Sequence, residues 1–176
     1  MKKEALSEVV FSEAEIDTRI RELAAEINCD YAGKDLVVVG VLKGAFMFFS
    51  DLVKRMNVRP TLDFVRIASY GNSMSGNERI YLTKDVELPL QDKHVLVVED
   101  VVDTGRSMEF LFGQLAARGA ASVKLCALVD KCERRTVDIK VDYTGFKLDE
   151  GFIVGYGLDY AEKYRELPEI RILELS

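Results

Sequence analysis

Three carboxylates and a short polar loop follow a strand-like apolar run near the middle of this 176-residue chain. The run from His94 to Val98 ends at Glu99 and Asp100, and Asp103 then opens the loop. The loop consists of Asp103, Thr104, Gly105, Arg106 and Ser107. Because a helical pattern follows, its backbone N–H groups and hydroxyls suit a phosphate. The two carboxylates beside it need a cation or sugar hydroxyls, so we expect a phosphorylated sugar together with Mg²⁺.

Three other interpretations of these residues are weaker. Acids that merely cap a solvated helix would not come with Thr, Gly and Ser in register. Glu99-Asp100 also resembles the strand end of a P-loop nucleoside triphosphatase, but the chain has no GxxxxGK[ST] motif. Gly155-Tyr-Gly157 begins like a dinucleotide fingerprint, but Tyr160 occupies the position of its third glycine.

The elements that must position the loop alternate along the chain. A capping box at Ser12–Glu15 and apolar residues at helical spacing predict a helix over 13–28. The continuous apolar run 36–42 is typical of a parallel strand that is buried on both faces. Similar patterns predict helices at 45–56 and 107–118 and strands at 61–68, 80–83, 94–99, 123–129 and 138–143. This alternation indicates a doubly wound α/β sheet, which binds ligands at the carboxyl ends of its strands.

The composition is that of an ordinary globular protein, with 48% apolar and 31% charged residues. We expect one domain spanning residues 1–176, large enough for a core without disulfides. No segment approaches the ~20 apolar residues of a membrane span, so no membrane partner is expected. The formal net charge of −6 argues against nonspecific nucleic-acid binding.

Residues outside the loop indicate the compartment and exclude some chemistries. Residues 1–5 contain two lysines with no apolar region behind them, so no signal peptide is expected. Cys29, Cys126 and Cys132 are odd in number and lack CxxC spacing, which is typical of free thiols in a reducing compartment. A cytoplasmic location is therefore expected. His94 is the one histidine of the sequence, which excludes a Ser-His-Asp triad and a multi-histidine metal site.

The segment from His94 to Ser107 closely resembles the 5-phosphoribosyl-1-pyrophosphate (PRPP) signature of type I phosphoribosyltransferases. From about Leu36 to Leu167 the motifs and their order are similar to those of the hypoxanthine-guanine branch of that family. The resemblance implies an α/β fold with a central, mostly parallel sheet flanked by helices and a small hood formed by the terminal segments. It implies purine salvage, in which the phosphoribosyl group of PRPP passes to N9 of hypoxanthine or guanine with release of pyrophosphate.

The same resemblance assigns roles to the acidic residues. Glu99 and Asp100 would approach the ribose hydroxyls, while residues 103–107 would wrap the 5′-phosphate. Glu99 and Asp100 would hold Mg²⁺, and Asp159 would hold a second Mg²⁺, partly through water. Asp103 would act as general base or acid at purine N7, and this fits the chemistry because the imidazole ring must lose a proton.

Two cations are assigned to pyrophosphate. Lys43 and Gly44 follow the first buried strand, where a lysine at a helix start is electrostatically unfavourable and therefore suggests a function. By resemblance this pair lies in the pyrophosphate-binding loop, often with a non-proline cis peptide. Arg165 would also reach pyrophosphate.

Four residues are assigned to the purine, and the backbone carbonyls around two of them, Ile153 and Asp159, would set discrimination at its C2 position. Lys131 would donate to the 6-oxo group, and a cation there favours an oxo acceptor over an amino donor. Phe152, otherwise an ordinary core residue, would stack on the base, and the backbone of Ile153 would meet its C2 edge. The neighbouring Cys132 is expected to be a passive thiol.

A closing loop is expected over 69–80, beginning with Ser69 and Tyr70. Its polar, glycine-containing stretch 70–77 is suited to movement, and closure would exclude water from the site. Ala68 stands where some relatives carry lysine, which leaves any contact at that position without support.

Two alternatives of other kinds remain open at this stage. A regulator on the same fold would bind PRPP or nucleotides and control RNA or DNA, but the acidic charge and Asp103 argue against it. A phosphoribosyltransferase for xanthine or uracil differs only in the base it takes, and the residue types do not separate the 6-oxopurines. A homodimer or homotetramer is expected, with the apolar stretch 45–49 as one possible interface.

Overall fold

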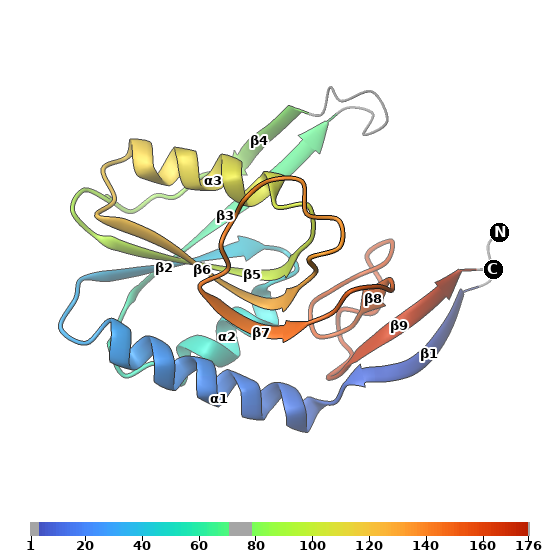
Figure 1. The fold of residues 1–176 in the computed structure, drawn as a ribbon. Coiled ribbons are helices and arrows are strands. Elements are labelled where there is room, and N and C mark those ends of the chain that lie inside the picture. The colour runs from blue at the N-terminus through green and yellow to red at the C-terminus, as the bar shows by residue number, and fades with distance from the viewer. Residues whose placement is uncertain (1–3, 71–78, 176) are drawn as a thin grey trace.

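The computed structural model describes residues 4–70 and 79–175 (Figure 1). Its helices are α1 (Glu13–Asp30), α2 (Phe46–Val53) and α3 (Arg106–Ala117). Its strands are β1 (Glu4–Phe11), β2 (Leu36–Leu42), β3 (Thr61–Tyr70), β4 (Arg79–Lys84), β5 (His94–Val102), β6 (Ser122–Asp130), β7 (Tyr143–Lys147), β8 (Ile153–Val154) and β9 (Ile170–Leu175). The α/β class predicted from the alternation of elements is confirmed.

A six-stranded sheet with the order β4-β3-β2-β5-β6-β7 forms the centre of the structure. Strands β3, β2, β5, β6 and β7 run parallel, and β4 joins the edge antiparallel to β3. The chain moves from β2 to β3 on one side and later places β5 on the other side of β2. The carboxyl ends of β2 and β5 therefore form a topological switch point, where open α/β sheets bind ligands.

Both faces of this sheet are covered, which explains the unbroken apolar strands. Helices α1 and α2 lie on one face and α3 on the other (Figure 1). In β2, Val38 packs in the cluster with α1 and α2, whereas Val37 and Val39 pack in the cluster with α3. Strands buried on both faces read as continuous apolar runs rather than as alternating ones.

Helix α1 begins as its sequence predicts. The Ser12 hydroxyl accepts a hydrogen bond from the Glu15 backbone N–H at 3.3 Å, and the Glu15 carboxylate accepts one from the Ser12 N–H at 2.9 Å. Both halves of the capping box are thus present. The helix continues to Asp30, two residues beyond the predicted end.

Two predicted elements are wrong in their bounds. The strand expected at 138–143 is instead β7 at 143–147, because Ile139 and Val141 pack beside the α3 cluster rather than pairing with β6. Apolar and polar residues therefore alternate here because every second side chain packs toward α3, although the segment forms no strand. The helix expected at 45–56 ends at Val53.

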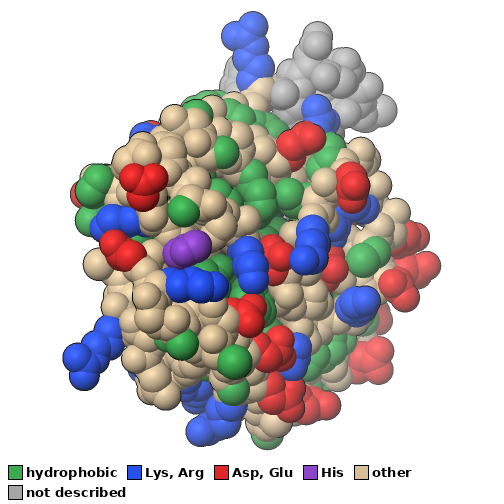
Figure 2. All heavy atoms as spheres, turned by 60° about the vertical axis from the view of Figure 1, so that its left-hand side comes forward, with side chains coloured by type: hydrophobic (Ala, Val, Ile, Leu, Met, Phe, Trp, Pro, Cys, Tyr) green, Lys and Arg blue, Asp and Glu red, His purple; other side chains and the backbone are tan. Residues whose placement is uncertain are grey.

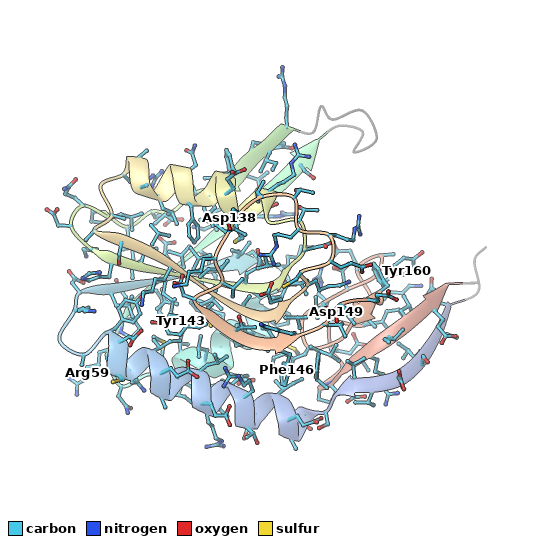
Figure 3. All side chains as sticks on the ribbon, viewed as in Figure 1. Arg59, Asp138, Tyr143, Phe146, Asp149 and Tyr160 are labelled. Carbon is cyan, nitrogen blue, oxygen red and sulfur yellow. The ribbon has the colours of Figure 1, made fainter. Side chains whose placement is uncertain are left out.

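The two ends of the described chain form a second, smaller sheet. Strand β9 lies between β1 and β8, and all pairs are antiparallel. The ring of Phe11 at the end of β1 stacks on Phe146 of β7 at 4.1 Å, and Figure 3 shows Phe146 pointing from β7 toward the α1 side. This sheet is the small hood expected of the terminal segments. No helix in the described part of the chain combines the length and hydropathy required to cross a membrane.

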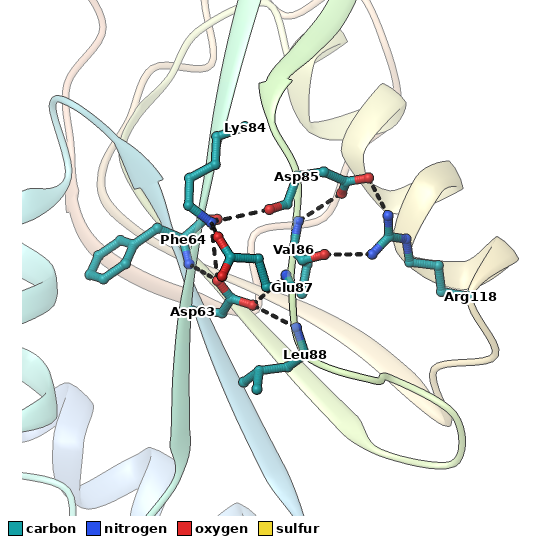
Figure 4. Close-up of polar contacts among 8 residues, drawn as sticks. All are labelled: Asp63, Phe64, Lys84, Asp85, Val86, Glu87, Leu88 and Arg118. Atoms are coloured by element: carbon teal, nitrogen blue, oxygen red, sulfur yellow. Dashed lines mark hydrogen bonds and ion pairs between the residues drawn. The ribbon is translucent and has the colours of Figure 1, made fainter.

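A buried carboxylate fixes the edge that carries β3 and β4. Asp63 is 8% exposed, and one of its oxygens accepts N–H groups of Glu87 and Leu88 at 2.7 and 3.0 Å (Figure 4). Its other oxygen accepts the N–H of Phe64 and lies 3.4 Å from the Lys84 ammonium. Burial raises the pKa of Asp63, but these donors outweigh it, so the pKa lies below its ordinary value.

We expect Asp63→Ala to lower the free energy of unfolding by about 2–3 kcal/mol, because it leaves buried N–H donors without an acceptor. Asp149→Ala, at an exposed loop position, is the control and should change it by less than about 0.5 kcal/mol. Chemical denaturation of both variants at pH 7 measures the difference. Equal, small effects would contradict the assigned role.

The same network predicts a pH dependence. Since the pKa of Asp63 is lower in the folded chain than in the unfolded one, its stabilisation is complete above the unfolded value of about 4 and is lost as pH falls further. The stability difference between the wild type and Asp63→Asn should therefore narrow as pH falls from 7 to 3. Denaturation at several pH values tests this, and a difference that stays constant would contradict it.

Candidate functional site

The ends of β2 and β5 meet so closely that only glycine fits between them. A Cβ on Gly44 would lie 1.7 Å from the Asp100 Oδ2 atom. A Cβ on Gly157 would in turn lie 2.1 Å from the Gly44 carbonyl oxygen. The peptide bond between Leu42 and Lys43 is cis, one bond before the Lys43–Gly44 bond where the family resemblance implied a cis peptide. Three segments distant in sequence thus converge at the switch point.

The carboxylate pair lies at the end of β5. Glu99 is 8% exposed, and one of its oxygens accepts the Asp100 backbone N–H at 3.0 Å. Burial, and then the adjacent charge of Asp100, raise the pKa of Glu99 well above its ordinary value. A buried carboxyl beside a second one is stabilised by a cation or by hydroxyl donors, as the sequence pattern suggested.

The loop after β5 borders a small pocket, called the cradle below, for which the sequence predicts an anionic ligand. Gly105 has a φ of +84° and precedes α3, whose N-terminus has no side-chain cap. A Cβ on Gly105 would lie 2.7 Å from a methyl group of Ile139, so the loop packs closely against the 137–141 segment. A pocket of about 170 Å³ is lined by Glu99, Asp100, Val101, Val102, Asp103, Thr104, Gly105, Ser107 and Met108. Arg106 begins α3, and the first-turn N–H groups of that helix are suited to a phosphate.

Asp103 carries an oxygen without a partner. Its Oδ1 is buried and has no hydrogen-bond partner among the described residues, whereas Oδ2 lies 3.4 Å from the Arg134 guanidinium. Buried polar atoms in native structures are satisfied, and an exception needs an explanation such as a catalytic role. The unpartnered Oδ1 therefore fits an acceptor for a ligand's N–H or O–H.

Arg135 supports the loop from behind, a role that the sequence patterns did not reveal. Its Nε donates to the Asp103 carbonyl at 2.9 Å, and its Nη1 donates to the Ile139 carbonyl at 3.1 Å. Its Nη2 is paired with Asp130, which is 7% exposed. In the sequence, the charges of Asp130, Arg134 and Arg135 could have suggested an ion pair. Charges near a strand end are usually solvated, however, so they did not by themselves predict one.

The cation and the aromatic residue predicted to contact the purine lie next to two other strands, Lys131 after the end of β6 and Phe152 before the start of β8. Lys131 directly follows β6, and its backbone N–H donates to the Val102 carbonyl at 2.9 Å. Its ammonium donates to the Gly151 carbonyl at 2.7 Å. Phe152 is 47% exposed and meets the Tyr160 ring edge-on at 5.6 Å, whereas Ile153 is buried in β8. Figure 3 shows Tyr160 on the side where β8 lies. Phe152 thus presents an open ring, as expected for a stacking residue.

Both cations expected to bind pyrophosphate are paired with acids. The Lys43 ammonium lies 2.8 Å from the Glu162 carboxylate. The Arg165 guanidinium lies 2.7 Å from Asp159 and 3.4 Å from Glu162. Asp159 also accepts the Glu162 backbone N–H at 2.8 Å, so its carboxylate is engaged away from the β5 pair.

The acids of the site fit a magnesium ion only with help from other ligands. In the residues the structure describes, no three His, Cys, Asp or Glu side chains converge on one metal position. Glu99 and Asp100 offer the hard oxygen atoms that Mg²⁺ prefers. Because Mg²⁺ usually keeps waters and binds through one or two carboxylates and substrate oxygens, the pair fits such a site.

The predicted closing loop lies partly inside the structure. Ser69 and Tyr70 end β3 and pair with Ile80 and Arg79 of β4, and Ala68 lies beside them in β3. Residues 71–78 lie outside the described residues. The described ends of the predicted loop, at the end of β3 and the start of β4, lie at the same edge of the sheet as the carboxyl end of β2.

Other notable features lie away from this edge or do not suit a phosphate. His94 begins β5, and its ring nitrogen Nδ1 lies 2.8 Å from the hydroxyl of Ser122, which begins β6. This contact supports a structural role for His94. Cys29, Cys126 and Cys132 are free, as expected. A larger cavity of about 520 Å³ lies between α1, α2 and the 156–168 segment. Its lining includes four carboxylates, from Glu13, Asp17, Asp51 and Glu166, which would repel a phosphate.

Comparison with known proteins agrees with this geometry. The family model described as "Phosphoribosyl transferase domain" matches residues 12–161. The chain is 38% identical over 174 residues to a hypoxanthine-guanine phosphoribosyltransferase of Bacillus subtilis, covering 99% of this chain and 97% of that protein. It is 42% identical over 163 residues to a hypoxanthine phosphoribosyltransferase of Haemophilus influenzae, covering 91% of each.

A longer relative and two solved structures complete the comparison. The chain is 44% identical over 169 residues to the "Bifunctional protein TilS/HprT" of Listeria monocytogenes but spans only 26% of its length. A hypoxanthine phosphoribosyltransferase structure from Staphylococcus aureus matches with a TM-score of 0.92 and 40% identity, covering 96% of this chain and 92% of that one. A hypoxanthine-guanine phosphoribosyltransferase structure from Bacillus anthracis matches with a TM-score of 0.90 and 37% identity, covering 98% and 100%.

Arg135→Met should lower the free energy of unfolding by about 3–5 kcal/mol, because it leaves Asp130 as a buried carboxylate without its cation. The control is Arg134→Met, which removes an exposed neighbouring arginine and should change stability by at most about 0.5 kcal/mol. Denaturant unfolding of the two variants gives the comparison. If both variants lose the same free energy of unfolding, the role of Arg135 in supporting the loop is wrong.

Proposed function

The chain belongs to the phosphoribosyl transferase domain family, and on that premise we propose that it transfers the 5-phosphoribosyl group of PRPP to N9 of hypoxanthine or guanine. The products are IMP or GMP and pyrophosphate, as in purine salvage. The observation that carries the proposal is the Glu99–Asp100 pair, with Glu99 buried, followed by the loop 103–105 and a helix N-terminus without a side-chain cap, at the switch point of the sheet. A phosphorylated sugar matches both halves of that site.

PRPP binding would use the cradle and the carboxylate pair together. The loop residues 103–107 would receive the 5′-phosphate through backbone N–H groups and the hydroxyls of Thr104 and Ser107. Glu99 and Asp100 would accept the ribose hydroxyls. Mg²⁺ held by this pair, and a second ion at Asp159, would neutralise negative charge on the pyrophosphate.

Asp103 would handle the proton of the base. In the transfer, a bond forms between N9 and C1′ while the bond from C1′ to the pyrophosphate oxygen breaks, and the imidazole ring loses a proton. The buried Oδ1 of Asp103 has no partner, so it is available to accept that proton from N7. The Arg135 contact with the Asp103 carbonyl would keep the residue in place.

Lys131 and Phe152 would orient the purine. The exposed ring of Phe152 offers a stacking face, and the Lys131 ammonium offers a donor to the 6-oxo group. In the structure that ammonium donates to Gly151, a contact that it would exchange for the base. The backbone of Ile153 would meet the C2 edge.

The leaving group and the reactive ribose need separate protection. Lys43, Arg165 and the loop N–H groups would stabilise the charge that develops on departing pyrophosphate. A closing loop that begins at Ser69 and Tyr70 would exclude water from the ribose cation. The exposed Cys29 and Cys132 thiols support a reducing, cytoplasmic setting for this activity.

The rival functions receive less support. A nucleic-acid regulator would need a basic face, and on the face drawn in Figure 2 the basic and acidic side chains are interspersed. The exposed Phe46 at the start of α2, 42% accessible, supports association of the chain as a homodimer or homotetramer.

The purified chain should form nucleotide from PRPP and Mg²⁺ with hypoxanthine and guanine. It should not do so with adenine, which presents an amino donor in place of the oxo acceptor for Lys131, or with uracil, which has no imidazole ring for Asp103 to deprotonate. Chromatography of reactions with each base, xanthine included, measures this. Nucleotide from adenine or uracil but not from the oxopurines would contradict the base assignment. If no base reacts, the proposed activity is wrong.

Asp103→Asn should lower kcat by at least about 100-fold, because proton transfer by a placed side chain contributes a factor of this size or more. Binding of PRPP should change little. Asp138→Asn, an exposed acid in the segment behind the loop, is the control and should turn over normally. Unchanged turnover in Asp103→Asn would remove this residue from the chemistry.

A further inference from the structure

The carboxylate of Glu162 forms ion pairs with both cations that the proposed function assigns to pyrophosphate, Lys43 and Arg165. The same oxygen of Glu162, Oε2, lies 2.8 Å from the Lys43 ammonium and 3.4 Å from the Arg165 guanidinium. Two cations that converge on one anionic oxygen form the arrangement that a phosphate oxygen would require. Glu162 therefore stands where the proposed function expects a pyrophosphate oxygen.

The backbone holds Glu162 in this place. Its N–H donates to Asp159 at 2.8 Å, and the backbone groups of Tyr160 and Lys163 pair across it. Ala161 and Glu162 have φ angles of 51° and 64°, in the left-handed region that residues other than glycine rarely adopt. Such a conformation persists only where the surroundings enforce it.

The segment that carries Glu162 also packs directly on the Lys43 loop. A Cβ on Gly157 would lie 2.1 Å from the Gly44 carbonyl, and the Arg165 guanidinium donates to the Gly157 carbonyl at 2.7 Å. The carboxylate and the two cations thus belong to segments with a fixed spacing. The bridge is a consequence of the fold rather than of one flexible side chain.

The contacts are nevertheless weak enough to exchange. The side chains of Glu162 and Lys43 are 66% and 47% exposed, and exposed ion pairs contribute little because water screens them. The hydrogen bond from Lys43 is the main cause that lowers the pKa of Glu162, so this group is a carboxylate at neutral pH. A pyrophosphate brings several anionic oxygens and can displace a single carboxylate.

We infer that Glu162 is an internal competitor for the pyrophosphate group: in the free site it pairs with Lys43 and, together with Asp159, with Arg165, and it releases both cations when PRPP or pyrophosphate binds. This inference rests on the proposed function and adds a residue that sets its affinities. By lowering the affinity for pyrophosphate in both substrate and product, Glu162 would favour product release after transfer.

The test is Glu162→Gln, which keeps the shape of the side chain and removes its charge. Magnesium pyrophosphate titrated into this variant by calorimetry should bind roughly two- to tenfold more tightly than to the wild type, since two weak ion pairs no longer compete. The KM for PRPP should fall by a similar factor while the KM for hypoxanthine stays unchanged. Glu162→Ala should shift both values in the same direction.

The matched control is Glu166→Gln, which removes the same charge four residues along the chain from a side chain that forms no ion pair with Lys43 or Arg165 among the described residues. It should bind magnesium pyrophosphate as the wild type does. If Glu162 had a purely structural role, Glu162→Gln would instead weaken the binding of every ligand and lower the midpoint temperature of thermal unfolding.

The outcomes separate this inference from the proposed function. If the wild type forms nucleotide and binds pyrophosphate but Glu162→Gln binds it equally or more weakly, the inference is wrong and the function stands. If the wild type neither forms nucleotide nor binds magnesium pyrophosphate, both are wrong. Tighter binding in Glu166→Gln as well would show a general charge effect and would also overturn the inference.

Discussion

A carboxyl group buried at the end of a central strand requires a partner, and this requirement organises the whole site. Glu99 is 8% exposed beside Asp100, so burial and a like charge both oppose its ionisation. The order of the parallel strands brings the end of β2 to the same point, where the missing side chain of Gly44 permits contact with Asp100. The loop for which we propose the 5′-phosphate as ligand follows in the chain. The proposed function supplies what this edge needs, since Mg²⁺ and ribose hydroxyls are the natural partners of the two acids.

The ion pairs around this edge fall into two classes with different consequences. The pair of Arg135 and Asp130 is nearly buried and also binds two backbone carbonyls, so it maintains the shape of the cradle. Breaking such a pair is costly because it leaves a charge without water or a partner. The pairs formed by Glu162 with Lys43 and Arg165 share a carboxylate side chain that is 66% exposed, so water screens it and the pairs are exchangeable. The Arg135–Asp130 pair fixes the geometry of the loop, whereas the pairs of Glu162 neutralise cations that would bind a ligand.

Sequence patterns predicted the central sheet and the cradle because each depends on local rules. Unbroken apolar runs, a capping box and a loop between strand and helix are visible within a few residues. The 138–143 strand was wrong because its alternation reflects packing beside α3. The roles of Arg135 and Glu162 could not be predicted, because their partners lie on other elements and a single sequence does not reveal which distant charges meet. Resemblance supplied the hood and the roles of the individual residues, which local patterns do not encode.

The central claim is that the end of β5 and the loop behind it form a magnesium-dependent site for PRPP. Calorimetric titration of PRPP into the purified chain, with Mg²⁺ and then with excess chelator, tests this most directly. The account predicts one PRPP per chain and an affinity at least about tenfold lower once Mg²⁺ is removed, because the two acids would then face the ligand without a cation. Equal affinity with and without Mg²⁺, or no binding at all, would contradict it.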